Sequence, residues 1–168
     1  MAIPYSVTPT LLKGGIRHVC YEYANLISAA SCDLHGSPPW RTHCDDAFLL
    51  GYRKMRDFLM RDKRSTRQGV ELPDILALDY LPFGCTRSWD LPTWNLEWHG
   101  AMDKQLAHIT FERDKEWNHI KWVPTLESEM RTAWDAFLNA VVDSSFRAEF
   151  DAQLAVCRAQ SGFGTLML

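Results

Sequence analysis

The segment THCDDAFLLGYRKMRDFLMR, residues 42–61, decides the fold class because its apolar residues recur at intervals of three and four. One narrow face of such a helix would carry the apolar side chains of Cys44, Phe48, Tyr52, Met55 and Leu59. Thr42 can cap the N-terminus, and Asp45 and Asp46 follow in the first turn, where the helix dipole favours acids. The segment predicts a helix from about Thr42 to Arg61 that packs against a core.

The same periodicity predicts further helices on both sides of this segment. We expect them at residues 9 or 15 to 31, 73–81, 94–111, 124–142 and 145–159. Pro73 and Pro124 suit the first turn of a helix, where a missing N–H costs nothing. The stretch RDKRSTRQG, residues 61–69, is predicted to be an exposed loop, and residues 82–93 a proline-rich connection.

These elements predict an all-α fold. The 168 residues suit one helical domain spanning the whole chain, with 1–14 and 160–168 as candidate flexible ends. We expect a bundle of four to five main helices with a long aromatic and proline-rich connection. The composition, 46% hydrophobic and 23% charged, is that of a globular protein with a sizeable core.

Charge and cysteine usage narrow the setting. A net charge of −3 restricts any nucleic-acid role to a local patch, and no apolar run reaches the ~20 residues that span a membrane. The N-terminal residues lack the compact apolar segment of a secretory signal. Five cysteines without a C-x-x-C pair argue against a disulfide framework and a structural zinc site. We therefore expect a cytoplasmic protein with no cofactor and no metal.

A basic segment, residues 53–67, is the candidate for contact with RNA or DNA. It holds seven cationic side chains against Asp57 and Asp62. Arginine-rich loops bind phosphate backbones by releasing counterions. The candidate contacts are Arg53, Arg56, Arg61, Lys63, Arg64 and Arg67. The alternative is a helix C-terminus stabilised by cations and followed by a solvated loop.

Arg113 and His119 have five residues between them, which matches the R-x(4–6)-H spacing of HEPN ribonucleases. In such a site the arginine holds a phosphate while the histidine transfers protons during attack by a ribose 2′-hydroxyl. Roughly one match is expected by chance in a chain of this composition, so a surface arginine and a loop histidine are the alternative.

His108 and Lys104 stand four residues apart on one face of the predicted helix over 94–111. A lysine beside a histidine lowers the histidine pKa and suits phosphate chemistry. The alternative is a histidine that forms a hydrogen bond to a neighbouring helix or loop. Metal chemistry lacks support, because Glu116-x-x-His119 is a single copy of a spacing that di-iron bundles use twice.

Tryptophans are concentrated in one part of the chain, at positions 89, 94, 98, 117 and 122. Such density could form a stacking platform for bases, fix long connections onto a bundle, or provide an aromatic patch for self-association.

Three blocks carry a resemblance: DAFLLGYRKMRDFLM (46–60), PDILALDYLP (73–82) and MDKQLAHITFER (102–113). In this order they resemble an uncharacterised family of small bacterial helical proteins, whose pattern is similar to HEPN-type bundles. HEPN-type bundles include RNases, toxin or phage-defence components, and catalytically silent interaction domains. The resemblance points to Lys104, His108, Thr110 and Arg113, together with Arg53, Arg56 and Asp57.

The sequence thus supports three functional hypotheses and leaves open whether the chain is an enzyme. The first is a helical bundle that acts by self-association or with a protein partner, in a bacterial defence or toxin context. The second is a metal-independent RNase that uses His108 or His119 with Arg113 and Lys104. The third is nucleic-acid contact through residues 53–67.

Overall fold

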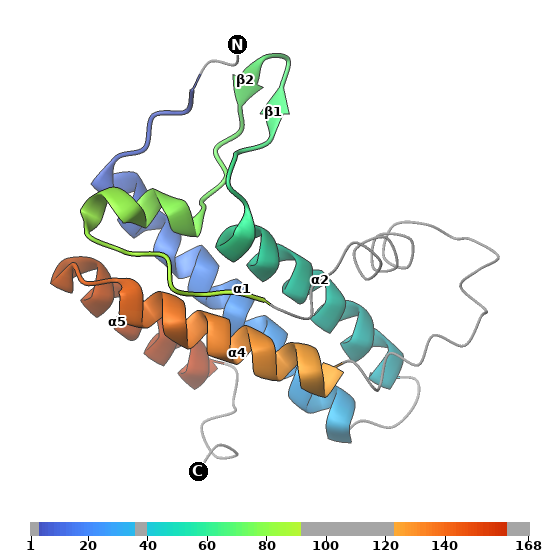
Figure 1. Cartoon of the computed structure of the whole chain (residues 1–168). Helices are drawn as coiled ribbons and strands as arrows, with labels where there is room; N and C mark the ends of the chain where they lie inside the picture. Colours follow the sequence, from blue (N-terminus) through green and yellow to red (C-terminus); the bar gives the residue numbers. More distant parts are fainter. Residues whose placement is uncertain (1–3, 36–39, 92–122, 161–168) are drawn as a thin grey trace.

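The computed structural model describes residues 4–35, 40–91 and 123–160. Four long helices make up most of these ranges: α1 (Pro9–His35), α2 (Trp40–Met60), α4 (Val123–Ala140) and α5 (Ser144–Gln160). They pack into one mostly helical body, with a 3-10 helix, η1 (Ala77–Phe83), beside them (Figure 1). The predicted all-α fold is confirmed.

Helices α1 and α2 run antiparallel and in close contact. Leu26 on α1 faces Gly51 on α2 so closely that a Cβ at Gly51 would lie 3.1 Å from the Cβ of Leu26. About one turn away, Lys54 Nζ lies 2.8 Å from Glu22 Oε1 across the same junction. The glycine thus lets the two backbones approach, and the apolar stripe read from residues 42–61 is buried against α1.

Helices α4 and α5 complete an aromatic core. Tyr23 of α1 stacks on Trp134 of α4 with ring centroids 4.5 Å apart. Phe137 of α4 meets Phe150 of α5 edge to face at 5.4 Å, a favourable geometry for two aromatic rings. The four-residue steps of Phe146, Phe150 and Leu154 place all three side chains in this core, as the sequence predicted.

The expected loop at 61–69 differs from what is observed. Residues 66–71 form a short antiparallel hairpin of β1 (Thr66–Arg67) and β2 (Val70–Glu71). Gln68 and Gly69 turn the chain with φ values of 53° and 78°. The hairpin projects beyond the end of α2 and is the only strand pairing in the described ranges (Figure 1).

The short helix in PDILALDYL begins later than Pro73 and is of the 3-10 type. Leu76 is extended, and its N–H donates to Asp79 Oδ2 at 2.8 Å, so the helix starts at Ala77. It ends at Gly84, whose φ of 85° is left-handed and whose N–H donates to the Leu81 carbonyl. The expected start at Pro73 is wrong because the Asp79 carboxylate fixes the helix start instead.

The other predicted helix bounds agree closely with the observed ones, except that Thr42 lies inside α2 and is not its cap. The predicted helix over 94–111 lies outside the described residues, as do four of the five clustered tryptophans. The fifth, Trp89, is buried and donates from Nε1 to the Leu59 carbonyl at 2.8 Å. It therefore anchors its connection onto α2, as one of the sequence hypotheses held.

The cysteines bring a correction. The sequence argued against a disulfide framework, yet Cys32 near the end of α1 is joined to Cys44 in the second turn of α2. Their Cα atoms are 6.0 Å apart, within the usual range for a bridge. Because the two cysteines lie 12 positions apart on different helices, no local sequence motif indicates that they pair. No helix in the described ranges has the length and apolar character to cross a membrane.

Candidate functional site

The four candidate catalytic residues, Lys104, His108, Arg113 and His119, lie outside the described residues. The basic segment 53–67 lies within them and covers the C-terminal part of α2, the connection that follows it and β1. The candidate site described below is therefore the basic segment and the residues that contact it.

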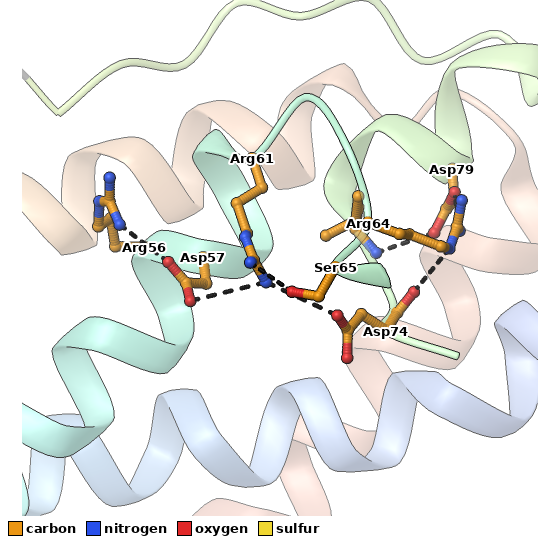
Figure 2. A network of polar contacts seen from close by, with 8 residues as sticks. Arg56, Asp57, Arg61, Arg64, Ser65, Asp74 and Asp79 are labelled. Atoms are coloured by element: carbon orange, nitrogen blue, oxygen red, sulfur yellow. Dashed lines mark hydrogen bonds and ion pairs between the residues drawn. The ribbon is translucent and has the colours of Figure 1, made fainter. Parts of the chain in front are cut away.

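Three of the six candidate phosphate contacts in this segment, Arg56, Arg61 and Arg64, pair with carboxylates of the same chain (Figure 2). Arg56 Nη1 lies 2.9 Å from Asp57 Oδ1. Arg61 Nη1 lies 3.9 Å from Asp57 Oδ2 and 3.6 Å from Asp74 Oδ2, and its Nη2 donates to Ser65 Oγ at 2.6 Å. Asp57 and Asp74 thus neutralise Arg56 and Arg61, two of the arginines predicted to contact nucleic acid.

Arg64 makes the most enclosed contacts of the segment. Its Nη2 donates to Asp79 Oδ1, its Nε donates to the Asp74 carbonyl at 3.1 Å, and its guanidinium lies 5.8 Å from the centre of the Tyr5 ring. The Arg64 and Asp79 side chains are only 13% and 8% exposed. This arginine therefore fastens the hairpin base to η1 and is not presented to solvent.

Two cations in the segment face water. Lys63 and Arg67 are exposed, and neither forms an ion pair with any residue in the ranges that the structure covers. Arg53 is half-buried on α2. The structure thus brings Arg56, Arg61 and Arg64 into an internal network with Asp57, Asp74 and Asp79. It leaves Lys63, in the connection after α2, and Arg67, in β1, exposed to solvent.

A small cavity lies beside the Arg64–Asp79 pair, with a volume of about 160 Å³. Its polar wall is formed by Arg64, Asp74 and Asp79, and its apolar wall by Val7, Leu11, Leu12, Pro73 and Ile75, with Tyr5 at the edge. Drug-sized ligands need pockets of roughly 300–1,000 Å³, and Arg64, the one cation among the described residues of the wall, already pairs with Asp79. The cavity is therefore smaller than a typical pocket for a drug-sized ligand.

Burial raises the pKa of three tyrosines and two cysteines in the core. Burial raises the pKa of Tyr23 to about 12 and that of Cys20 to about 12, with the nearby Cys157 thiol adding to the second shift. Burial likewise raises the pKa of Cys85 to about 11 and shifts Tyr52 and Tyr80 upward. Groups shifted in this direction stay protonated at neutral pH, so none is poised as a base or thiolate nucleophile.

Apolar side chains are exposed along one side of the α1–α2 pair. Leu11, Gly14, His18 and Tyr21 lie within an arc of about 80° on α1, and all four are exposed. Leu50 and Lys54 share a face of α2, and the Lys54–Glu22 ion pair places this face next to the α1 arc. We define the α1–α2 face as the set of Leu11, Gly14, His18, Tyr21, Glu22, Leu50 and Lys54. Within it, Leu11, Tyr21 and Leu50 are 50%, 54% and 46% exposed.

No protein-family model matches the chain, and neither the curated proteins nor the solved structures contain a match. The likeness to HEPN-type bundles therefore remains a prediction from sequence, while the all-helical body is established by the structure. In the described ranges, no group of three or more His, Cys, Asp or Glu residues is arranged to hold a metal ion.

Sequence reasoning missed two features of this region. Asp74 and Asp79 lie in the segment for which the sequence predicts a helix over 73–81, and their negative charge close to an arginine-rich segment is the signal that could have found them. The α1–α2 face was missed because Leu11, Tyr21 and Leu50 are separated in sequence by residues of the buried stripe. The pitch of α1 aligns Leu11 with Tyr21, and the antiparallel pairing of α1 and α2 adds Leu50 to the same side.

Proposed function

We propose that this protein acts by associating through the α1–α2 face with a second copy of its own chain. The carrying observation is that Leu11 and Tyr21 share one exposed arc of α1 while Leu50 lies on the neighbouring face of α2, each about half exposed. Single exposed apolar residues are ordinary on protein surfaces, but several along one face support a contact surface. Burial of tyrosine and leucine side chains against a partner removes apolar surface from water, which lowers the free energy of the complex.

The internal neutralisation of the basic segment supports association over nucleic-acid contact. Arg56, Arg61 and Arg64 would each have to leave a carboxylate before binding a phosphate. Such an exchange replaces one ion pair by another and yields little net affinity. An isologous dimer, in contrast, needs no rearrangement of the α1–α2 face, because the same surface can serve on both copies.

The test is the molecular mass of the full chain as a function of concentration, measured by sedimentation velocity. The wild type should shift from monomer towards dimer, and Tyr21→Glu and Leu50→Glu should each remain monomeric with an unchanged melting temperature. Val142→Glu is the matched control, because Val142 is 67% exposed but lies in the α4–α5 connection. A wild type that stays monomeric at every concentration would refute the proposal.

The RNase alternative rests on Lys104, His108, Arg113 and His119 and needs a separate assay. It requires cleavage of RNA by the pure chain in the presence of EDTA, because the chemistry of a histidine acid–base needs no metal. His108→Ala or His119→Ala should abolish that cleavage while the fold persists. Cleavage that survives both substitutions would contradict the proposed roles of His108 and His119, and absence of cleavage on varied RNAs would refute the RNase alternative.

A further inference from the structure

We propose that Cys32 and Cys44 form a reversible thiol–disulfide site that links the C-terminal part of α1 to the N-terminal part of α2. The two Cα atoms are 6.0 Å apart, and the residues are 12 positions apart in the chain. Both cysteines are half-buried, so a small thiol or disulfide in solution has a path to at least part of the pair. The inference does not depend on the proposed association.

The other cysteines differ from this pair in their access to solvent. Cys20, Cys85 and Cys157 are 0%, 6% and 7% exposed and lie in the hydrophobic core. The Sγ of Cys20 also donates to the Phe150 carbonyl at 3.8 Å. Because thiol–disulfide exchange requires an accessible thiolate, oxidation should be selective for Cys32 and Cys44.

The packing of α1 on α2 holds the two thiols together without the bond. Leu26 and Gly51 are in contact, and the Glu22–Lys54 ion pair adds a second tie between the helices. The reduced chain therefore keeps both sulfur atoms close to each other, so closing the bridge needs no refolding. A pair preorganised in this way can open and close within the folded state.

The oxidant class is a low-molecular-weight disulfide such as oxidised glutathione. The thiolate of one cysteine attacks a sulfur of the oxidant and releases one molecule of small thiol, which leaves a mixed disulfide on the protein. The thiolate of the second cysteine then attacks the protein sulfur of that mixed disulfide and releases the second small thiol. Two protein thiols are oxidised, one small disulfide is reduced to two thiols, and the reverse sequence reopens the bridge.

Closing the bridge should stabilise the chain, because it restricts the unfolded state across a short loop. For a loop of this length in a protein of this size, the melting temperature should rise by about 5–10 °C. The variants Cys32→Ser and Cys44→Ser should show no difference in melting temperature between oxidised and reduced buffers. Cys157→Ala, which removes a core thiol, should retain the full difference.

The experiment equilibrates the folded full-length chain in mixtures of reduced and oxidised glutathione, blocks free thiols with iodoacetamide and maps the linked peptides by mass spectrometry. We expect a Cys32–Cys44 linkage whose fraction falls as reduced glutathione increases. A Cys20–Cys157 linkage in its place, or a bridge that excess reduced glutathione cannot open without denaturant, would overturn the proposal. A redox-dependent melting shift that persists in Cys32→Ser would also overturn it. The linkage map uses the wild type alone, so it decides the matter even if a variant fails to fold.

Discussion

Arg64 and Asp79 form a nearly buried ion pair that ties the base of the hairpin to η1. Asp79 uses its second oxygen to accept the Leu76 N–H at 2.8 Å, so one carboxylate both pairs with the arginine and starts a helix. Arg64, a predicted nucleic-acid contact, thus stabilises the packing of the hairpin base on η1.

Replacing Arg64 with methionine should destabilise the fold by about 3 kcal/mol, because it leaves the Asp79 carboxylate enclosed without its partner. Methionine keeps much of the side-chain volume, so the loss reports the charge and its hydrogen bonds. The measurement is urea unfolding followed by circular dichroism. Arg87→Met is the matched control, because Arg87 pairs with the 71% exposed Asp62 and should cost about 0–1 kcal/mol. Equal losses in the two variants would contradict this role for Arg64.

Two glycines in the helix pair should respond in opposite directions to alanine. At Gly14 on α1 a Cβ would meet nothing within 4 Å, so Gly14→Ala should stabilise the fold by about 0.5–1 kcal/mol through helix propensity. At Gly51 the new methyl would lie 3.1 Å and 3.3 Å from the Cβ and Cα of Leu26, which cannot move aside by changing rotamer. Gly51→Ala should therefore destabilise the fold by about 1 kcal/mol. Urea midpoints measure both, and a stabilising Gly51→Ala would show that α1 and α2 separate easily.

Asp143 should make the stability of α5 depend on acid pH. Its Oδ1 accepts from Ser145 Oγ at 2.6 Å, from Ser145 N at 2.9 Å and from Phe146 N at 3.1 Å. The Ser145 hydroxyl, followed by the Phe146 N–H, lowers the pKa of this carboxyl below its usual 3.8. Since the folded-state pKa is depressed, the stabilisation is fully present above the unfolded-state pKa and is lost as the pH falls through the folded-state pKa.

The measurement is the urea midpoint of the wild type and of Asp143→Ala between neutral and acid pH. The variant should unfold at lower urea at neutral pH, and the two midpoints should begin to approach each other below the unfolded-state pKa and meet below the folded-state pKa. Asp151→Ala is a control in the same helix, because Asp151 pairs with Arg147 on the surface at 3.2 Å and caps nothing. A difference between wild type and Asp143→Ala that persists unchanged into acid would contradict the capping role of the ionised carboxyl.

The long helices could be predicted because each carries its own local signal. The stripe of Phe146, Phe150 and Leu154 is visible without any knowledge of what it packs on. The two-residue strands of the hairpin are too short to show alternation, so their sequence resembles a loop. The partners of Arg64 and of Cys32 lie across turns of the chain, and only the packing of helices assigns them. The ion pairs of the basic segment depend on these assignments, so they could not be predicted from the sequence.

Any binding of RNA or DNA should be weak and should involve few phosphates. Only Lys63 and Arg67 of the candidate contacts are exposed without an ion pair to a described residue. The logarithm of the binding constant should then fall with the logarithm of salt concentration with a slope of about −1 to −2. Fluorescence anisotropy with a labelled oligonucleotide measures this slope, and the double substitution of Lys63 and Arg67 by glutamate should remove the binding. A slope of about −4 or steeper would mean that Arg56, Arg61 and Arg64 leave their carboxylates.

The most direct test of the proposed association is hydroxyl-radical footprinting of the wild-type chain at low and high concentration, read residue by residue by mass spectrometry. Tyr21 and Leu50 are about half exposed in the single chain, and a partner seated on the α1–α2 face must cover them. Their oxidation rates should fall as the concentration rises, while the rate at Val142 stays constant. Association accompanied by unchanged rates at Tyr21 and Leu50 would contradict the account.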